Sequence, residues 1–437
     1  MPTKSPSDHP TNLFKELKQR GLVQDLSDQK QIEKELGEGN LTFYCGFDPT
    51  SDSLHVGSLL PLTMMKRLQA AGHKPLALVG SGTGMIGDPS GKSEERVLLG
   101  ADQISANISG ISAQIQTLLG DNFELVENGN WLAGLKLVEF LRDVGKHFSV
   151  NQMMAKDSVK SRLENREQGI SYTEFSYMLL QAYDFYHLYQ EKGCRLQIGG
   201  SDQWGNITEG IELIRRKTSG DEKDQNNKAL GFTFPLLTTS SGAKFGKTEK
   251  GAVWLSAERT SPYEFYQYWI NQPDQDALKM LNFFSFKGMG EIAELQSEHE
   301  KSPQKRIAQK ALAEELTSIV HGPEEVKKAE TAAQVFFGGS VTDLPGETLV
   351  EIFSDVPSSS LSKSDLEGGI DIVDLLVSSE LEKSKGAAKR SISGGGVYLN
   401  NQRVEDAELK VTSQDLVDSM VLILRLGKKK YHLVRVA

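Results

Sequence analysis

The segment PLALVGSGTGMIGDPSG, residues 75–91, decides the fold class. Its apolar start predicts a short buried strand, and the glycines that follow predict a loop. Upstream, LTFYCGFDP (41–49) has the pattern of another buried strand, and residues 52–73 that of a helix with Pro61 in its first turns. Strand, helix, strand and glycine loop make a βαβ unit. Such units bind nucleotides at the carboxyl ends of their strands.

The end of this loop, GDPSGKS (87–93), comes close to a phosphate-binding P-loop. A P-loop reads G-x-x-x-x-G-K-[ST], and Gly91, Lys92 and Ser93 fit its last three positions. Its first glycine would fall at residue 86, which is isoleucine. The segment is therefore either a surface turn or part of a different nucleotide site.

The rest of the chain continues the α/β pattern and then changes. Residues 101–195 are mainly helical in pattern, and short strands are expected at 194–203 and 232–239 with a helix between them. The polar stretch SSGAKFGKTEKG (240–251) is expected to be a loop. Helical periodicity returns from residue 261 to about 338. A turn-rich linker and a last small unit follow.

Composition indicates an ordinary soluble protein of two or three domains. The chain has 437 residues, of which 38% are hydrophobic and 25% charged. No apolar run is long enough to span a bilayer, and the N-terminus lacks the pattern of a signal peptide. Two cysteines cannot form a disulfide framework, so we expect a reduced, cytoplasmic location.

Charge is unevenly distributed along the chain. The net charge is -10, which disfavours nonspecific binding of nucleic acid by the molecule as a whole. From residue 381 onward, however, lysine and arginine outnumber the acidic residues. This basic tail is either a local polyanion contact or a solvated surface.

Several polar residues fall where chemistry is expected, and each has a simpler structural interpretation. His55 at a helix start either binds phosphate or caps its helix. Lys244 and Lys247 either close over a polyphosphate or are solvated. Asp202 either binds ribose hydroxyls or forms a turn. A polar stripe on one helix binds a zwitterionic substrate or faces water; it is formed by Tyr177, Gln181 and Asp184. The histidine and cysteine spacings indicate no metal site.

Seven segments in order resemble the bacterial-type tyrosyl-tRNA synthetases, a family of class I aminoacyl-tRNA synthetases. They are YCGFDPTSDSLHVGS, LVGSGTGMIGDPSGKSEER, FLRDVGKHFSVNQMM, SYTEFSYMLLQAYDF, LQIGGSDQWGNITEG, FPLLTTSSGAKFGKT and TSPYEFYQYWIN. The final AAKRSISGGGVYLNNQRVED is similar to the S4-type RNA-binding module of this family. By this resemblance GDPSGK is the family's own loop and not a P-loop.

The resemblance implies a fold and a domain order. We expect an α/β, Rossmann-like parallel-sheet catalytic domain over residues 1–250, with a helical insertion and dimer interface at about 122–185. An α-helical anticodon-region domain is expected over 251–340. A linker over 341–364 and a small α+β, S4-like RNA-binding domain over 365–437 complete the chain.

The resemblance also assigns site residues. Tyr44 and Asp184 would grip the phenolic hydroxyl of tyrosine, and Asp88, Tyr177 and Gln181 its ammonium, with Gln203 near its carboxylate. The residues expected to act on the ATP phosphates are Thr50, His55, Lys92, Arg96, Lys244, Lys247 and Thr248. Those expected around the adenosine and the substrate are Cys45, Gly46, Asp48, Gly57, Ser58, Gly200 and Asp202, with Asp202 on the ribose.

The implied reaction joins tyrosine to tRNA. Tyrosine and ATP with Mg²⁺ would give tyrosyl-adenylate and pyrophosphate, and the tyrosyl group would pass to the 3′ end of tRNA(Tyr). A homodimer is expected, with neither a membrane partner nor a protein-bound metal or organic cofactor. One departure is Ser58, where the class I signature usually has a second histidine. It leaves one alternative, a synthetase-like RNA-binding protein without activation activity. A P-loop NTPase is disfavoured by Ile86 and by the absence of an evident Walker B strand.

Overall fold

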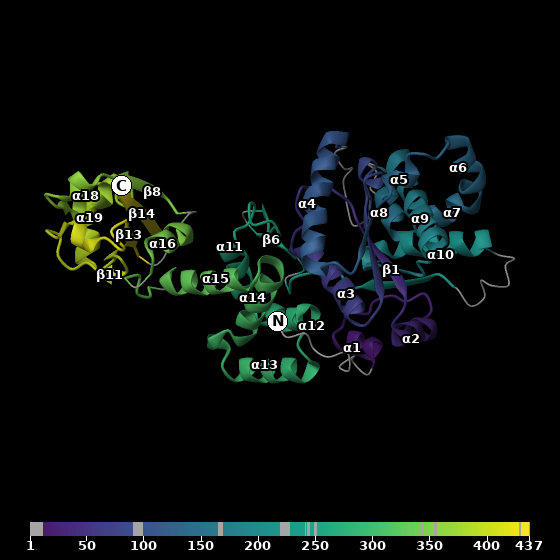
Figure 1. Cartoon of the computed structure of the whole chain (residues 1–437), viewed down its shortest axis with the longest axis horizontal. Coiled ribbons are helices and arrows are strands. Elements are labelled where there is room, and N and C mark those ends of the chain that lie inside the picture. The colour runs from purple at the N-terminus through teal and green to yellow at the C-terminus, as the bar shows by residue number, and fades with distance from the viewer. Residues whose placement is uncertain are drawn as a thin grey trace. The chain divides into compact units, whose positions relative to one another are not determined.

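The computed structural model divides the chain into two compact units, which are described separately (Figure 1). The first is Met1–Ser261 with Tyr268–Val320, and the second is Pro262–Gln267 with His321–Ala437. The structure describes residues 12–90, 99–164, 169–218, 228–240, 242, 245–248, 251–336, 338–342, 344–353, 356–427 and 430–436.

A five-stranded sheet forms the centre of the first unit. Its order is β3-β2-β1-β4-β5, and every neighbouring pair is parallel. The strands are β1 (Thr42–Phe47), β2 (Lys74–Val79), β3 (Glu124–Glu127), β4 (Leu196–Gly200) and β5 (Leu230–Phe234). From β1 the chain adds β2 and β3 on one side, and it then adds β4 and β5 on the other side. This order therefore creates a switch point beside β1, where open α/β sheets bind their ligands.

Helices cover both faces of this sheet, because β2, β4 and β5 are buried along almost their whole length. Tyr44, Leu76 and Leu78 pack in one cluster with Phe185 and Leu188 of α9 (Tyr172–Lys192). α10 (Trp204–Thr218) packs against α9, and α3 (Leu59–Ala70) and α4 (Ala101–Leu119) pack against each other and against β2. The prediction of a Rossmann-like parallel sheet is confirmed.

Local signals set the ends of the two helices that matter most for the site. α9 begins after Ser171, whose hydroxyl accepts a hydrogen bond from the Glu174 amide at 3.3 Å, and it ends at Gly193 with φ of 61°. α3 begins after the 3₁₀ turn Val56–Ser58 and carries Pro61 in its first turn, where no amide is needed.

Smaller helices complete the first unit. α1 (Leu13–Gln19) and α2 (Gln29–Glu38) precede the sheet, and α5 (Gly129–Leu132), α6 (Leu137–Asp143), α7 (Val150–Met154) and α8 (Asp157–Glu164) lie between β3 and α9. Later come α12 (Asp274–Phe284), α13 (Met289–Lys301) and, up to Val320, α14 (Ile307–His321). The helix α11 (Pro262–Ile270) is divided, with Pro262–Gln267 in the second unit and Tyr268–Ile270 in the first. Short 3₁₀ turns are Thr83–Met85, Gly145–His147, Ser201–Gln203 and Pro303–Lys305.

Two elements of this unit were not expected from the sequence. β3 lies in a stretch whose pattern is mainly helical, because only Val126 of its four residues is well buried. The polar loop 240–251 contains half of a small hairpin, β6 (Lys247–Thr248) with β7 (Gly251–Ala252).

The second unit is built on a mixed sheet of order β11-β10-β13-β14-β8. Its strands are β8 (Ser358–Leu361), β10 (Val397–Leu399), β11 (Gln402–Arg403), β13 (Val421–Leu426) and β14 (Lys430–Val436), and a small pair joins β9 (Ile370–Asp371) to β12 (Lys410–Val411). Its helices are α15 (Pro323–Phe336), α16 (Gly346–Ile352), α17 (Lys363–Leu366), α18 (Ile372–Ser378) and α19 (Lys385–Ser393), with a 3₁₀ turn at Ser413–Asp415.

The stretch expected to be a linker, 341–364, carries part of this second unit. It holds α16 and β8, and β8 pairs in parallel with β14 at the edge of the sheet. Leu349 of α16 is buried with Phe353 and with residues of β13 and β14. The predicted α+β character of the C-terminal domain agrees with this sheet, while its boundary at residue 365 stays a prediction.

No helix among the described residues is long and apolar enough to cross a membrane.

Candidate active site

The deepest part of the site is a pair of buried polar groups, Tyr44 and Asp184. Tyr44 lies on the central strand β1 and is 1% exposed, and Asp184 lies on α9 and is 2% exposed. Within the described part of the chain, the Tyr44 hydroxyl has no hydrogen-bond partner. Since buried hydroxyls are normally paired, this group is available to a ligand.

Two donors hold the Asp184 carboxylate in place. Trp131 Nε1 donates to Oδ1 at 2.7 Å, and Asn128 Nδ2 donates to Oδ2 at 2.9 Å. Burial raises the pKa of Asp184 to about 7, while the two hydrogen bonds lower it. Burial, and then the charge of Asp184, raise the pKa of Tyr44, so its phenol stays protonated. The pair offers one hydroxyl and one fixed acceptor, which suits a ligand that carries its own hydroxyl.

Asn128, which supports Asp184, was not predicted from the sequence. It is fully buried, and its Oδ1 accepts a hydrogen bond from the Gly82 amide at 2.8 Å. Its Nδ2 also donates to Thr83 Oγ1 at 2.9 Å. It therefore joins the glycine loop after β2 to Asp184. No sequence pattern marks it, because the contacts come from distant segments.

Asp48 and Tyr177 meet next to this group. The Tyr177 hydroxyl donates to Asp48 Oδ2 at 3.0 Å, and the Thr83 hydroxyl donates to Oδ1 at 2.9 Å. A Cβ on Gly80 would lie 2.2 Å from Asp48 Oδ1, so only glycine fits there. Tyr177 was predicted at the ammonium and Asp48 at the adenosine and substrate; the structure makes the two direct neighbours.

A second buried carboxylate, Asp88, lies within an amide network. Its Oδ1 accepts from the Ser90 amide at 2.9 Å, and its Oδ2 accepts from Gln203 Nε2 at 2.7 Å. Gln181 Nε2 in turn donates to Gln203 Oε1 at 3.2 Å. The predicted residues Asp88, Gln181 and Gln203 are thus brought together from a loop, α9 and the turn after β4. A carboxylate in this setting can accept an ammonium.

Two further residues extend this network without having been predicted. Asn206 of α10 donates to Gln181 Oε1 at 2.9 Å. Gln197 on β4 is in register with Tyr44, is 3% exposed, and its Oε1 has no partner among the described residues. The alternation of residues along β4 is the one sequence signal that could have found Gln197.

The histidine signature occupies the turn before α3. His55 caps the 3₁₀ turn, and its Nδ1 accepts a hydrogen bond from the Gly57 amide at 3.0 Å. A Cβ on Gly57 would lie 2.6 Å from the His55 ring, so the glycine allows this close approach. The Ser58 amide donates to the His55 carbonyl at 2.7 Å. His55 is therefore both a cap and an exposed ring, and the two interpretations of its role are compatible.

The tertiary structure brings this signature against the KFGKT loop (244–248). Gly246 has φ of +83°, and a Cβ there would lie 2.6 Å from Val56 Cγ2 and 3.5 Å from the Gly57 amide nitrogen. The Val253 amide donates to the Gly246 carbonyl at 3.0 Å, and the Val56 amide donates to the Val253 carbonyl at 2.9 Å. Two segments almost two hundred residues apart in sequence thus share one surface.

Some of the predicted phosphate residues cannot be placed. Lys92, Arg96 and Lys244 lie outside the described residues, and Lys247 and Thr248 are described only as backbone of β6. Thr50 is exposed, and its amide donates to the Asp48 carbonyl at 2.8 Å.

The remaining predicted residues line the ends of β1 and β4. Gly46 is exposed although β1 is the central strand, so the sheet opens to solvent at this point. Cys45 is buried, and burial raises the pKa of its thiol to about 12, which keeps it neutral. At the end of β4, a Cβ on Gly200 would lie 2.7 Å from Asp202 Oδ1, so a larger residue there would displace the Asp202 carboxylate.

The structure holds no group of three or more histidine, cysteine, aspartate or glutamate side chains, within its described ranges, that could bind a metal ion.

Comparison with known proteins identifies the class. The family of tRNA synthetases class I (W and Y) matches residues 36–338, and the tyrosine–tRNA ligase SYY-like C-terminal domain matches residues 348–434. The chain belongs to the class I tRNA synthetases, as its parallel sheet and paired signatures indicate.

Comparison with curated relatives shows which family of class I tRNA synthetases the chain belongs to. The chain is 51% identical over 435 residues to the tyrosine–tRNA ligase of Rhodopirellula baltica, covering 98% of each protein. It is 48% identical over 432 residues to that of Bacillus caldotenax, covering 98% of this chain and 100% of the relative. Within its class it is therefore a member of the tyrosyl-tRNA synthetase family, as the sequence motifs predicted.

A solved structure of the same family has a similar fold. The C-terminally truncated mitochondrial tyrosyl-tRNA synthetase of Aspergillus nidulans superposes with a TM-score of 0.66 at 31% identity, covering 74% of this chain and 93% of that one.

Proposed function

We propose that the buried Tyr44–Asp184 pair is the tyrosine-recognition end of an active site that performs tyrosine–tRNA ligation. This activity is the one that the family carries. In the first step a tyrosine carboxylate oxygen attacks the α-phosphorus of ATP, the bond to the pyrophosphate oxygen breaks, and tyrosyl-adenylate forms. In the second step a terminal hydroxyl of tRNA(Tyr) attacks the tyrosyl carbonyl carbon and AMP leaves.

The observation that carries this proposal is the unpartnered Tyr44 hydroxyl beside a carboxylate that other residues already fix. A phenol entering this space would donate to Asp184 and accept from Tyr44. Phenylalanine would leave the Tyr44 hydroxyl buried and unpaired and would not supply the third donor to Asp184; an unpaired buried group costs about 1–3 kcal/mol when neutral and more when charged. Sites built in this way reject the analogue without a hydroxyl by about 10⁴–10⁵, a range for which tyrosyl-tRNA synthetases themselves are the standard example.

At the other end of the substrate we assign the ammonium to Asp88, Tyr177 and Gln181. Gln203, which already donates to Asp88, is assigned to the tyrosine carboxylate. Asp88 and Gln203 come from loops at the carboxyl ends of parallel strands, and Tyr177 and Gln181 from α9. The tyrosine would therefore lie across the sheet edge with its carboxylate directed toward the His55 signature.

Activation needs no protein nucleophile, so alignment and positive charge supply the catalysis. We assign the phosphates to the side chains of Thr50, His55, Lys92, Arg96, Lys244, Lys247 and Thr248. Mg²⁺ would enter with ATP as part of the substrate. The contact of Gly246 with Val56 supports this assignment, because it puts the lysine loop beside the histidine signature.

The adenosine is assigned to the glycine-lined opening at the ends of β1 and β4. Asp202 would accept from ribose hydroxyls, and the exposed Gly46 would let the base approach the strand. The other residues assigned here are Cys45, Asp48, Gly57, Ser58 and Gly200. Ser58 can donate one hydrogen bond toward the ribose but carries no charge.

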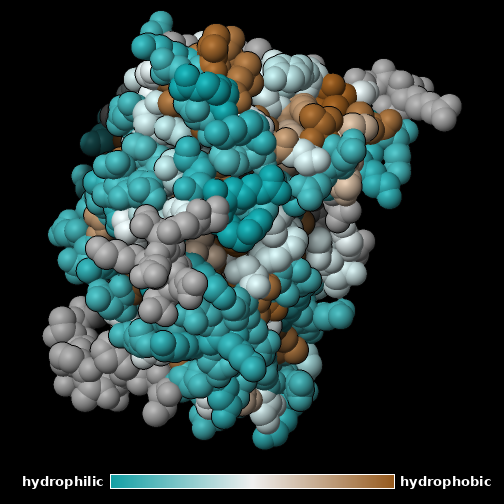
Figure 2. All heavy atoms as spheres, turned by 90° about the vertical axis from the view of Figure 1, so that its right-hand side faces the viewer, coloured by the Kyte–Doolittle hydropathy of each residue, from teal (hydrophilic) through white to brown (hydrophobic). Residues whose placement is uncertain are grey.

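We further propose a homodimer formed through the helices before α9. Large apolar side chains are exposed along these helices and at the start of α9: Leu137 (71%), Val138 (77%), Leu141 (46%), Val150 (57%), Met154 (45%), Leu163 (42%) and Tyr172 (75%). Figure 2 shows apolar side chains gathered on the face that carries α6 and α7. Exposed apolar surface of this kind is typical of a protein interface, and a second copy presents the same patch.

The tRNA is assigned to the helices after residue 261 and to the basic C-terminal unit, whose S4-like character stays part of this proposal. We propose that the protein is cytoplasmic, in keeping with its two cysteines, which are both buried free thiols.

Tyrosine-dependent ATP–pyrophosphate exchange tests the activation step. Exchange is expected with tyrosine, and neither phenylalanine nor tryptophan should support it at comparable concentration. Glu38→Gln, which changes an exposed carboxylate at the end of α2, outside both the pocket and the proposed interface, serves as the control and is expected to leave the exchange unchanged. Folded protein that binds tRNA(Tyr) but shows no exchange with any of the three amino acids would instead support an RNA-binding protein that lacks activation.

A further inference from the structure

Two arginines are buried side by side at the carboxyl end of α12, away from the tyrosine pocket. Arg20, which follows α1, is 2% exposed, and Arg67 of α3 is 6% exposed. Charged side chains are almost never this deeply buried unless they are paired with other polar or charged groups. No step assigned above uses either of them.

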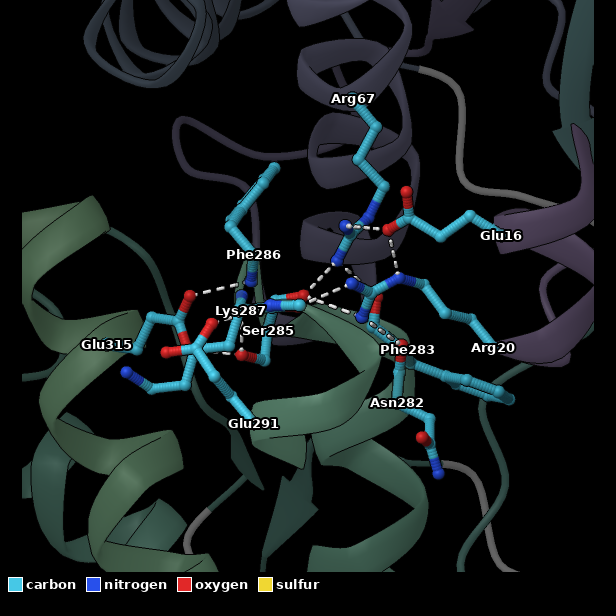
Figure 3. A network of polar contacts seen from close by, with 11 residues as sticks. Glu16, Arg20, Arg67, Asn282, Phe283, Ser285, Phe286, Lys287, Glu291 and Glu315 are labelled. Carbon is cyan, nitrogen blue, oxygen red and sulfur yellow. Dashed lines mark hydrogen bonds and ion pairs between the residues drawn. The ribbon is translucent and has the colours of Figure 1, made fainter. Parts of the chain in front are cut away.

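Both guanidinium groups grip backbone carbonyls (Figure 3). Arg20 donates to the carbonyls of Asn282 at 3.2 Å, Ser285 at 2.9 Å and Lys287 at 2.6 Å. Arg67 donates to those of Phe283 at 3.4 Å and Ser285 at 2.5 Å. The last carbonyls of a helix lack partners within the helix and carry a partial negative charge. The arginines therefore cap α12 from two other elements.

We call the pair Arg20 and Arg67 the arginine clamp. An acidic side chain and an aromatic side chain contact it. Glu16 Oε1 lies 2.7 Å from Arg20 Nε and 3.8 Å from Arg67 Nη1. The Arg67 guanidinium lies 4.5 Å from the centre of the Phe286 ring. Burial, and then the charge of Arg20, lower the pKa of Arg67 to about 9, while Glu16 raises it. Arg67 remains cationic near neutral pH, so the carbonyls are needed to offset the cost of burying its charge.

The amino-terminal half of α12 holds the start of the loop that contains KFGKT. Asp276 is 2% exposed, and its Oδ1 accepts a hydrogen bond from the Ser240 amide at 2.8 Å. The Ser240 hydroxyl donates to Oδ2 at 3.3 Å. Residue 240 is the first of the loop 240–251, so this end of the loop is tied to α12.

The far end of α12 reaches the same loop through aromatic side chains. Phe284, the last residue of α12, packs edge-on against Trp269 with ring centres 5.5 Å apart. Trp269 in turn packs against Phe245 at 5.7 Å. Phe245 belongs to KFGKT and precedes Gly246, which contacts Val56. Both halves of α12 are thus linked to the loop.

Through α3 and α12, the clamp connects the His55–Ser58 turn with the KFGKT loop, and direct contact between the turn and the loop completes a closed set of contacts, which we call the circuit. Arg67 lies on α3, which begins directly after the His55–Ser58 turn, and α3 packs against α12. α12 holds the KFGKT loop, and the loop contacts the His55–Ser58 turn through Gly246. A shift of α12 relative to α3 would therefore move the lysine loop relative to the histidine signature.

We propose that Arg67, together with Arg20, is a positioning residue for adenylate formation, because the clamp fixes α12 to α3 and so sets the alignment of the KFGKT loop with the His55–Ser58 turn. This inference rests on the proposed function of that site. Arg67 touches no substrate and acts through α12. The clamp should affect the ATP step and leave recognition of the tyrosine phenol unchanged, since Tyr44 and Asp184 lie outside the circuit.

Arg67→Lys in the full chain is the main test. It keeps the positive charge but loses the fork of donors that reaches two carbonyls. We expect the kcat of tyrosine-dependent ATP–pyrophosphate exchange to fall by about tenfold to a hundredfold, the range that small misalignments cause. The KM for tyrosine should stay within about twofold, because phenol and ammonium binding are unchanged.

The control is Arg195→Lys. Arg195 also makes a forked contact, with Glu35 Oε1 at 2.6 Å and Oε2 at 3.1 Å, but it lies at the start of β4, outside the circuit. It should lower the thermal unfolding midpoint and leave kcat within about twofold of wild type. If Arg67→Lys lowers the midpoint equally while kcat stays at the wild-type value, the arginine is only structural and the proposal is wrong.

Asp276→Asn decides the matter if Arg67→Lys does not fold. This variant leaves both arginines in place and weakens the hydrogen bonds to Ser240. It should lower kcat with little change in the KM for tyrosine, and an unchanged kcat would overturn the proposal. If both single variants fold, their effects should combine to less than the product, because both act through α12. Fully multiplicative effects would show that the two sites act independently.

A readout without activity separates this inference from the proposed function. In Arg67→Lys, hydrogen exchange at the amides of Ser240, Phe245 and Val253 should rise by about tenfold or more, and in Arg195→Lys it should not. Wild-type protein without pyrophosphate exchange would refute the proposed function alone. Unchanged hydrogen exchange in folded Arg67→Lys would refute the coupling, whatever the activity.

Discussion

The proposed tyrosine pocket and the proposed ATP signatures of this chain are built in opposite ways. In the pocket, Tyr44 and Asp184 are buried, and neighbours fix the carboxylate before any ligand arrives. At the signatures, Thr50 and His55 are exposed, and the turn that follows His55 meets a polar loop through Gly246.

The difference follows from what each end has to do. Rejecting phenylalanine requires polar groups that stay unpaired unless a hydroxyl arrives, which is possible only in a rigid, dry site. Activating a carboxylate requires positive charge at the phosphates when ATP is bound, and loops can supply it by closing over the ligand. Changes in the pocket should therefore alter selectivity, and changes at the signatures should alter rate.

The largest expected effect breaks the pocket. Asp184→Asn keeps the shape of the side chain but removes the anionic acceptor, so the ratio of kcat/KM for tyrosine over phenylalanine should fall by about a hundredfold or more. Pyrophosphate exchange with each amino acid measures it. A ratio that stays at the wild-type value would mean that Asp184 does not contact the phenol.

The second prediction breaks the signatures. Gly246→Ala puts a Cβ at positive φ and 2.6 Å from Val56, so the loop has to move away from the His55–Ser58 turn. The kcat of exchange should fall by about tenfold or more while the KM for tyrosine is retained. Gly242→Ala is the matched control, because Gly242 also has positive φ, of +81°, but nothing lies within 4 Å of its Cβ. Equal losses in both variants would assign the effect to backbone strain alone.

The third prediction concerns the support of Asp184. Trp131→Phe keeps an aromatic ring and removes the N–H that donates to Oδ1 at 2.7 Å. Since a hydrogen bond to a charged group contributes about 1.5–3 kcal/mol, kcat/KM for tyrosine should fall by about tenfold or more. Pyrophosphate exchange measures this effect. A loss of kcat/KM for ATP at saturating tyrosine, with the KM for tyrosine unchanged, would contradict a role in the pocket.

The fourth prediction is a pH dependence of the pocket. The pKa of Asp184 is about 7, and the carboxylate form has to accept the phenol hydrogen. The kcat/KM for tyrosine should therefore fall about tenfold for each pH unit below about 7, and this limb should be absent in Asp184→Asn.

The same raised pKa has an opposite consequence for stability. The folded state binds this proton more tightly than the unfolded state, so its contribution is present below about pH 4 and is lost as pH rises through about 7. Denaturant titrations at pH 5 and pH 8 should show a larger loss of stability with rising pH for wild type than for Asp184→Asn.

The smallest effect sharpens the comparison at the signature. Ser58→His restores the usual second histidine of the class, and we expect kcat/KM for ATP to rise by no more than about threefold, with tyrosine parameters unchanged. An increase of several hundredfold would mean that Ser58 had disabled the site, as the alternative of an inactive RNA-binding protein requires.

Contiguous motifs were sufficient to predict most of the candidate site residues that the fold brings together. The glycine loop at 80–91 and the βαβ pattern identified the parallel sheet, because strand burial and glycine turns are local properties of the chain. The segments around Tyr44, Asp88 and Tyr177 were sufficient to name residues that the fold brings together. β3 was missed because it lies at the sheet edge and buries little, and the element content of 341–364 was missed because β8 forms its strand by pairing with β14.

The sequence by itself determined which chemistry the chain carries, since the residue types within each motif are adjacent along the chain. Only the tertiary structure decided how those motifs meet. Asn128 reaches Asp184, Gly246 reaches Val56, and Arg67 reaches the end of α12. Each contact joins segments that are distant in sequence, and it is made because burying the surrounding apolar surface brings their backbones together.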